Sequence, residues 1–179
     1  MTRRSHPKLS LLEPTARLRS RFIDAALQSR ALHGRWVHAP DTPQRFALYL
    51  KHMREPSSRG HWVCTDDGEL AGVVNVTQIV LGVFRSAYLG YYAFEPHAGK
   101  GYLRQGLTQV IDRAFREYGL HRMEANIQPG NTRSIALVKG LGFELEGYSP
   151  KYLKLGGRWR DHERWAIRVE TWRGRKRGR

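Results

Sequence analysis

The sequence predicts a single α+β domain in which helices interrupt a mostly antiparallel central sheet. Its length supports one domain, because 179 residues, 40% of them hydrophobic, suit one core. Apolar residues recur at helical spacing in some segments and at strand spacing in others. The strand-like segments in the middle and the last third of the chain follow one another across short turns, which favours antiparallel neighbours.

The first third of the chain is expected to hold a short strand and two helices. Residues 8–12 alternate like a strand, and residues 18–27 follow with apolar positions at helical spacing. Asp41 and Thr42 can cap a second helix that carries Pro43 in its first turn. Residues 35–40, between the two helices, predict a loop.

Strand signals dominate the middle of the chain. Residues 61–64, 70–80 and 87–94 are rich in β-branched and aromatic residues and are separated by short turns, so they predict antiparallel strands. From Leu103 to Tyr118 the apolar residues keep an i, i+3, i+4 pattern, which predicts an amphipathic helix. Gly119 follows and is expected to end that helix.

The last third is expected to add strands around one more helix. Residues 122–128 predict a strand, and residues 131–142 predict a short helix closed by glycine. Residues 143–169 then predict two strands joined at a turn of two glycines, Gly156 and Gly157.

The chain is strongly basic, with 31 Lys and Arg against 16 Asp and Glu and a formal charge of +15. Such an excess favours polyanions: a phosphorylated cofactor, RNA or a ribosomal surface. Residues 172–179 predict a basic, disordered tail after a domain of residues 1–171, and solvation alone explains such a run. Trp159, Trp165 and Trp172 lie among arginines and could stack on nucleic acid, although core packing explains Trp159 and Trp165 more simply.

Several classes of protein are disfavoured. The single cysteine, Cys64, cannot form an internal disulfide, and the basic start lacks the apolar run of a signal peptide. No segment approaches the roughly 18 to 20 apolar residues of a membrane span. The eight histidines show no paired metal spacing. We therefore expect a soluble cytoplasmic protein without a metal site or a membrane partner.

Residues 97–107 place three glycines and a lysine just before the predicted amphipathic helix. Glycine beside a helix start lets a ligand approach the main chain, and the unpaired amides there attract phosphates. We expect a diphosphate on the amides from Gly99 to Arg104, with Lys100 and Arg104 adding charge. Plain solvent exposure is the alternative role of these two cations.

The region from Leu89 to Tyr148 resembles the GNAT family of acetyl-coenzyme A dependent N-acetyltransferases. Residues 98–103, "AGKGYL", lie where that family carries its pyrophosphate loop; Gly101 matches the family pattern. Ala98 and Leu103 depart from it. The segments "LGYYAF", "HAGKGY", "NTRSIALVKGLGF" and "WRDHERWAI" are most similar to the Rim-type branch, which acetylates the N-terminal amine of ribosomal proteins. The resemblance implies the GNAT fold and acetyl-CoA as co-substrate.

The resemblance also implies where the cofactor binds. Its pantetheine arm would lie beside the strand at residues 90–94, and Asn131 would hydrogen-bond the pantetheine end. Asn131 could equally cap a helix, and Tyr92 could simply pack. The expected cofactor-binding residues are Tyr92, Ala93, Phe94, Ala98, Gly99, Lys100, Gly101, Tyr102, Leu103, Arg104, Asn126, Asn131 and Ser134.

The expected catalytic residues are Ser134, Glu95 and Tyr148. Many family members carry a tyrosine, the general acid for the leaving thiolate, seven residues after the coenzyme-binding asparagine, and here that position is Val138. Ser134 lies where the Rim-type branch is thought to use a hydroxyl instead; packing of a small hydroxyl is the alternative. Tyr148 or Tyr152 is a secondary candidate for the general acid. Glu95 is the carboxylate closest to the expected thioester and could equally be a strand-end charge.

The acceptor class follows from amine chemistry. An α-amine with a pKa of about 7.7 to 8.0 is roughly one-tenth neutral at pH 7, whereas a lysine amine near 10.4 is neutral at well under one part in a thousand. This favours acetylation of a protein N-terminus, with a ribosomal protein as one candidate and rRNA contact through the basic ends. Two alternatives stay open: a noncatalytic ribosome- or RNA-binding module of the same fold, and acetylation of a small-molecule amine or antibiotic. The chain could be a monomer or a dimer.

Overall fold

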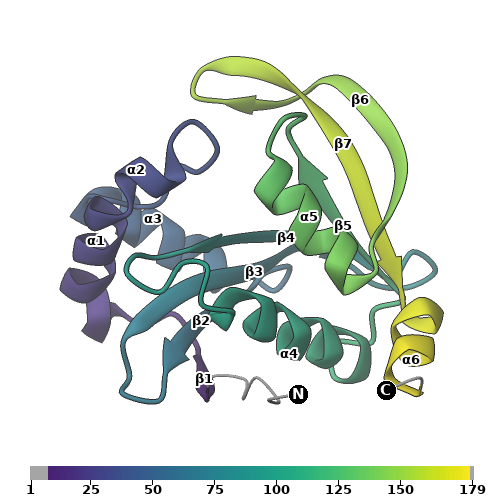
Figure 1. Cartoon of the computed structure of the whole chain (residues 1–179), viewed down its shortest axis with the longest axis horizontal. Coiled ribbons are helices and arrows are strands. Elements are labelled where there is room, and N and C mark those ends of the chain that lie inside the picture. Colours follow the sequence, from purple (N-terminus) through teal and green to yellow (C-terminus); the bar gives the residue numbers. More distant parts are fainter. Residues whose placement is uncertain (1–7, 178–179) are drawn as a thin grey trace, which may run out of the picture. The chain divides into compact units, whose positions relative to one another are not determined.

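A computed structural model describes residues 8–177, with side chains described up to residue 174. Seven strands form one sheet in the order β1-β2-β3-β4-β5-β7-β6 (Figure 1). The chain divides into two compact units. The N-terminal unit comprises the chain up to Asn75 together with Tyr91–Val110, and the C-terminal unit comprises Val76–Gly90 together with the chain from Ile111 onward. The predicted α+β class with a mostly antiparallel sheet is confirmed.

The N-terminal unit begins as predicted, with a short strand followed by helices. Strand β1 pairs antiparallel with β2, from Leu9 opposite Thr65 to Leu12 opposite Trp62. Thr42 caps α3, because its side chain accepts a hydrogen bond from the Arg45 amide at 3.3 Å. The elements are β1 (Leu9–Leu12), the 3-10 helix η1 (Ala16–Leu18), α1 (Arg19–Gln28), α2 (Arg30–His33), α3 (Pro43–Met53), β2 (Arg59–Thr65) and β3 (Leu70–Val80), which crosses into the C-terminal unit.

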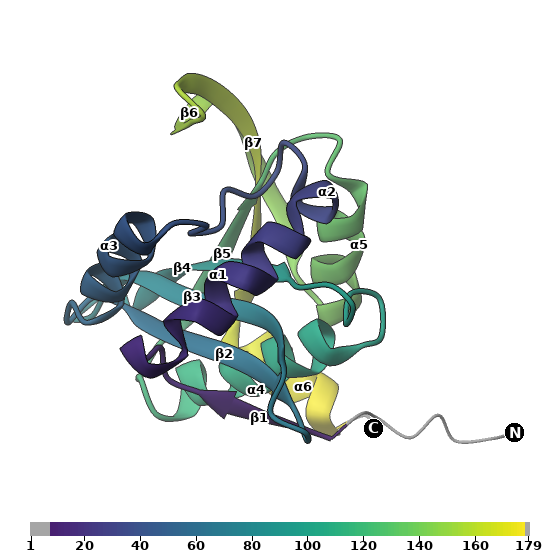
Figure 2. The same cartoon turned by 90° about the vertical axis from the view of Figure 1, so that its left-hand side faces the viewer.

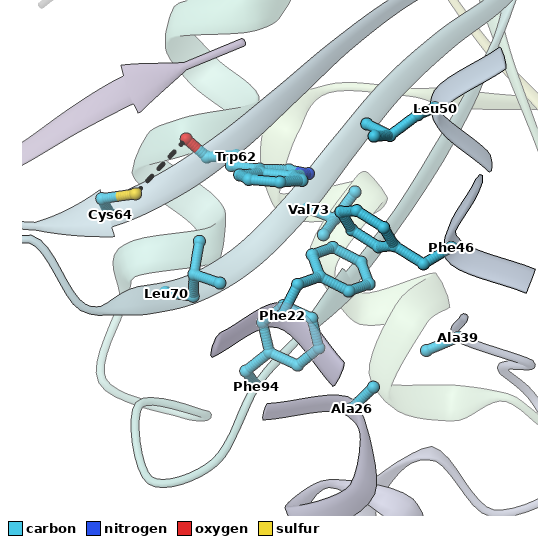
Figure 3. Close-up of a cluster of buried hydrophobic side chains, with 10 residues drawn as sticks. All are labelled: Phe22, Ala26, Ala39, Phe46, Leu50, Trp62, Cys64, Leu70, Val73 and Phe94. Carbon is cyan, nitrogen blue, oxygen red and sulfur yellow. Dashed lines mark hydrogen bonds between the residues drawn. The ribbon is translucent and has the colours of Figure 1, made fainter. Parts of the chain in front are cut away.

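An aromatic cluster forms the core of the N-terminal unit (Figure 3). The Phe22 ring lies at its centre, 5.1 Å from the ring centroids of both Phe46 and Trp62 and 5.4 Å from that of Phe94. All four side chains are fully buried. Aromatic rings of this size provide much of the apolar area that a core of this size removes from water. The cluster therefore ties α1, α3 and β2 to the chain just after β4.

Helix α4 (Tyr102–Arg116) follows β4 (Ser86–Ala93) and the glycine loop, close to the predicted bounds. Gly106 faces β2 so closely that a Cβ there would lie 2.4 Å from Cγ2 of Val63. No residue larger than glycine fits without a shift of the helix or the strand. Leu107 and Val110 are fully buried on the same side of the helix, as the apolar pattern predicts.

The C-terminal unit contains one parallel strand pair. Ser86 to Tyr88 of β4 lie opposite Arg122 to Glu124 of β5 (Arg122–Ile127) in a parallel ladder, which α4 makes possible by acting as the crossover connection. Strand β5 then pairs antiparallel with β7 (Arg158–Arg168), which pairs antiparallel with β6 (Glu144–Leu155). Helix α5 (Thr132–Leu141) connects β5 to β6.

The predicted disordered tail of residues 172–179 is wrong for its first six residues. They belong to helix α6 (Val169–Arg177), so the predicted domain boundary at residue 171 falls inside a helix (Figure 1). Trp172 is only 6% exposed, and its indole N–H donates to Asp112 at 3.3 Å. Glu170 of the same helix lies 3.1 Å from Nε2 of His121, so Trp172 and Glu170 together dock the basic helix. Residues 178 and 179 lie outside the described residues.

Core packing was the simpler prediction for two tryptophans of β7, and it is right for only one. Trp165 is 5% exposed and packs where β7 lies between β5 and β6. Trp159 is 60% exposed. It lies on the outer part of β7, beyond Glu163, the first residue of that strand to pair with β5. Figure 2 shows this end of the β6–β7 hairpin extending beyond β5.

Across the part of the chain that the structure describes, no helix is both long and apolar enough to cross a membrane.

Candidate active site

The glycine loop before α4 has the backbone conformation of an anion cradle. Gly99 and Gly101 have φ angles of +75° and +90°, which residues with a Cβ rarely adopt. A Cβ built at either position would meet nothing within 4 Å, so the space beside both glycines is open. The loop leads directly into the N-terminus of α4, where the first amides have no intrahelical partner. Successive exposed amides at a helix start attract phosphate groups.

His97 anchors this loop to the turn between β2 and β3. Its Nε2 lies 2.9 Å from Oε2 of Glu69, and its ring packs edge-on against Tyr102 at 5.6 Å between centroids. The amide of His97 also donates to the Phe94 carbonyl at 3.0 Å. Sequence reasoning missed this role, because Glu69 is 28 residues away and no local pattern joins the two side chains.

The loop side chains divide into packed and exposed groups. Tyr102 packs on His97, and Leu103 reaches toward β3, where a Cβ at Gly72 would lie 3.3 Å from Cδ1 of Leu103. Lys100 and Arg104 are exposed, as is the backbone at both loop glycines, whereas Ala98 is half-buried. A ligand in this loop would therefore meet main-chain amides and two cationic side chains.

The Phe94 side chain lies in the core of the N-terminal unit and Tyr92 packs against it, which is the packing role weighed for Tyr92. Phe94 is fully buried, and Tyr92 packs against it at 5.5 Å between ring centroids. The Tyr92 hydroxyl is buried and has no hydrogen-bond partner among the described residues, and burial raises the pKa of this phenol well above its ordinary value. The Phe94 backbone is also engaged, because its amide donates to the Ala71 carbonyl at 2.9 Å and its carbonyl accepts from the His97 amide at 3.0 Å.

The junction of α1 and α2 holds the chain at the end of β4. Nε2 of the buried His33 lies 2.8 Å from the carbonyl oxygen of Ala93, and the Glu95 amide donates to Oγ of Ser29 at 2.9 Å. Burial lowers the pKa of His33, so the ring is neutral at pH 7 and donates its Nε2–H to that carbonyl. The Glu95 carboxylate is exposed. No sequence signal pointed to Ser29 or His33.

In the C-terminal unit, Asn131 and Ser134 come together at the start of α5. Oδ1 of Asn131 accepts a hydrogen bond from the Ser134 amide at 3.3 Å, so Asn131 is the N-cap of the helix. The cap uses only the amide oxygen, which leaves Nδ2 of Asn131 as a donor for a ligand. Ser134 is half-buried. Val138, at the position of the family's usual tyrosine, is fully buried in the core.

The hydroxyl groups of two tyrosines on β6 form hydrogen bonds. The Tyr148 hydroxyl donates to Oδ2 of Asp161 at 2.6 Å, and this bond raises the pKa of Tyr148. Asp161 also accepts from the Lys151 amide at 2.7 Å, which lowers the pKa of the carboxyl. The Tyr152 and Tyr88 hydroxyls lie 2.9 Å apart, and this contact raises the pKa of Tyr152 to about 12. The Tyr148 proton is therefore committed to Asp161.

Asn126 lies on β5 directly opposite Arg164 of β7. Oδ1 of Asn126 and Nε of Arg164 are both buried, and neither has a hydrogen-bond partner among the described residues. On the same face of β5, Glu124 is buried and paired with Arg122 at 2.6 Å. The ion pair with Arg122 therefore explains why Glu124 is buried, whereas no hydrogen bond explains why Oδ1 of Asn126 is buried.

The predicted residues thus form two sets. Glu95, the β4 residues and the glycine loop lie in the N-terminal unit, whereas Asn126, Asn131, Ser134 and Tyr148 lie in the C-terminal unit. Among the described residues, no three His, Cys, Asp or Glu side chains gather as a metal site would require.

A model of the acetyltransferase (GNAT) domain matches residues 9–144. The chain belongs to the GNAT acetyltransferase family. The ribosomal protein uS5-alanine N-acetyltransferase of Escherichia coli (strain K12) is 41% identical over 107 residues, which cover 60% of this chain and 55% of that relative. The chain therefore aligns with about half the length of that protein. A Vibrio cholerae spermidine N(1)-acetyltransferase is 26% identical over 149 residues, which cover 82% of this chain and 86% of that enzyme.

Among solved structures, Mycobacterium smegmatis RimJ in complex with CoA-disulfide superposes with a TM-score of 0.81 and 26% identity, over 96% of this chain and 90% of that one. The resemblance expected from the sequence is confirmed at the level of fold and family. Acetyl-CoA is the acetyl donor of GNAT acetyltransferases, and the open loop at Gly99 and Gly101 fits its diphosphate.

Proposed function

We propose that this chain transfers the acetyl group of acetyl-CoA to the N-terminal α-amine of a protein. The observation that carries the proposal is the open glycine loop at the start of α4, which offers main-chain amides and two cations to a diphosphate. The family membership supports acetyl transfer as the reaction. The E. coli relative, named for alanine acetylation of a ribosomal protein, supports a protein N-terminus as the acceptor.

Each unit holds residues proposed to bind the cofactor. The amides of Gly99 and Gly101 and those of the first turn of α4 would hold the diphosphate, whereas the Lys100 amide donates to the His97 carbonyl at 3.3 Å and its side chain would add positive charge. Nδ2 of Asn131 would donate to the pantetheine end while Oδ1 keeps the helix cap. Bound acetyl-CoA supplies a thioester carbonyl that an amine can attack, so the residues of the chain act mainly by positioning.

Two protons must move during the reaction: the amine loses one, and the departing thiolate gains one. Ser134 is the proposed proton donor. Tyr148 is a weaker candidate because its proton is bound to Asp161 at 2.6 Å. Glu95 is the proposed base, since its carboxylate is exposed and its amide is fixed by Ser29. An α-amine needs little help from a base, because roughly one-tenth of it is already neutral at pH 7.

Acetylation of a polyamine is the second candidate, because a spermidine acetyltransferase aligns with most of this chain. The charge of the protein argues against it. A chain with a formal charge of +15 repels a small polycation, whereas a protein N-terminus carries at most one positive charge at its amine.

Release of the coenzyme A thiol in the presence of different acceptors tests the proposal. We expect release with peptides that begin with alanine or serine, and much slower release with spermidine or an α-blocked lysine peptide. Ser134→Ala should lower kcat at least tenfold, whereas Thr132→Ala, which removes an exposed hydroxyl from the same helix, should not. Equal rates for the wild type and the Ser134 variant would remove Ser134 from the mechanism. Faster turnover of spermidine than of any peptide would overturn the acceptor class.

A further inference from the structure

The outer end of the β6–β7 hairpin is a two-stranded ribbon, residues 151–160, which we call the arm. Strand β7 pairs with β5 only from Glu163 onward, whereas its ladder with β6 continues to Arg158 opposite Leu155. The arm therefore projects past β5, as both views of the hairpin show (Figures 1 and 2). Its sequence, "KYLKLGGRWR", contains four Lys and Arg and no Asp or Glu.

The cations of the arm do not stabilise the hairpin through ion pairs. Within the described side chains, those of Lys154, Arg158 and Arg160 form neither an ion pair nor a hydrogen bond, and all three are exposed. By contrast, Arg122 and Arg168, which lie nearer the middle of the sheet, pair with glutamates at 2.6 and 2.7 Å. Unpaired cations that are close together attract a polyanion.

Trp159 follows Arg158 and precedes Arg160 along β7, so strand alternation puts its ring on the opposite face of the ribbon from these two cations. It is 60% exposed, and its cross-strand neighbour on β6 is Lys154. By contrast, Trp62 in the N-terminal unit is fully buried, and Trp165 on β7 itself is only 5% exposed. An exposed indole provides a flat surface on which a base stacks, and Lys154 lies on the same face to bind an adjoining phosphate. Arg158 and Arg160 would bind phosphates where the strand passes around the edge of the ribbon.

We propose that the arm binds single-stranded nucleic acid, with a base stacked on Trp159 and phosphates held by Lys154, Arg158 and Arg160. Single strands fit better than a duplex because their bases are free to stack on a protein ring. An acidic chain such as polyglutamate would match the cations but offers no ring to stack on the indole.

Binding of a fluorescently labelled 12-nucleotide oligouridylate, followed by anisotropy at several salt concentrations, tests the inference. We expect binding that weakens as salt rises, together with quenching of Trp159 emission as the base stacks. Trp159→Ala should weaken binding about tenfold and remove the quenching. Arg158→Ala with Arg160→Ala should reduce the slope of log affinity against log salt by about 1.4, the value for two phosphate contacts to a single strand. An oligothymidylate of equal length shows whether RNA or DNA is preferred.

The matched control is Lys51→Ala with Arg54→Ala, which removes the same charge from exposed positions at the end of α3. We expect this pair to leave the affinity within about twofold of wild type. Trp159→Phe keeps an aromatic ring and should bind better than Trp159→Ala, which separates loss of stacking from a folding defect. Equal effects of the arm and control substitutions would overturn the proposal. Equally tight binding of polyglutamate would also overturn it, because an acidic chain has no bases.

Discussion

The N-terminal unit and the arm use aromatic residues in opposite ways. In the N-terminal unit, Phe22, Phe46 and Trp62 are fully buried and pack against one another at 5.1 to 6.2 Å between centroids. In the arm, Trp159 is exposed and its cationic neighbours are unpaired. The first arrangement explains stability. The exposed Trp159 and the unpaired cations of the arm contribute little to stability, so we infer that they bind a partner.

The largest effect expected from this comparison is on folding. Phe22→Ala should lower the free energy of unfolding by about 3 to 5 kcal/mol, because it leaves a cavity at the centre of the aromatic cluster. Trp159→Ala should change it by less than about 0.5 kcal/mol. Urea denaturation followed by circular dichroism measures both values. Similar losses from the two substitutions would mean that the arm packs against the fold after all.

A second comparison concerns two glycines on either side of the α4 start. Gly101 lies in open space at φ +90°, whereas Gly106 is pressed against Val63. Gly101→Val should raise the dissociation constant for coenzyme A at least tenfold, because the side chain fills the space proposed for the diphosphate and strains the loop. Calorimetric titration measures the change. Gly106→Ala is the control: it should lower the melting temperature while the fraction that stays folded binds coenzyme A normally.

Acid should destabilise both units through buried histidines. Burial lowers the pKa values of His33 and His162, so below about pH 6.5 the unfolded state binds more protons than the folded state. Stability should therefore be greatest above pH 6.5 and fall as the pH drops through 6 toward 5. Melting temperatures across this range measure the loss. His33→Gln, which keeps a donor for the Ala93 carbonyl but does not titrate, should flatten the profile; an unchanged profile would exclude His33 as its source.

The smallest expected effect distinguishes two roles of the Asn131 side chain, helix capping by Oδ1 and ligand binding by Nδ2. Asn131→Asp keeps an oxygen for the helix cap but removes the Nδ2 donor, so stability should hold while the KM for acetyl-CoA rises several-fold. Asn131→Ala should additionally cost about 1 kcal/mol of stability through the lost cap. Steady-state kinetics and thermal melts distinguish the two. An unchanged KM in both variants would confine Asn131 to capping.

Features that depend on neighbouring residues could be predicted from the sequence. The Thr42 cap, the apolar face of α4 and the glycine loop each follow from a short pattern, and the structure contains all three. The Asn131 cap was one of two roles weighed for that residue, and it is present.

Features that depend on distant partners could not be predicted. His33 is 60 residues from Ala93, and no local pattern shows which carbonyl its ring will meet. The exposure of Trp159 depends on where β5 stops pairing with β7, which an alternating strand pattern does not encode. For α6 the run of positive charge hid two contacts with distant residues, Trp172 with Asp112 and Glu170 with His121.

The central claim is that this chain acetylates an α-amine. Mass spectrometry of a peptide with a free N-terminal alanine and an internal lysine, incubated with the protein and acetyl-CoA at pH 7, tests it most directly. The account predicts one added acetyl group, located on the N-terminal nitrogen and absent when that amine is blocked. Acetylation of the lysine, or of spermidine while the peptide stays unmodified, would contradict it.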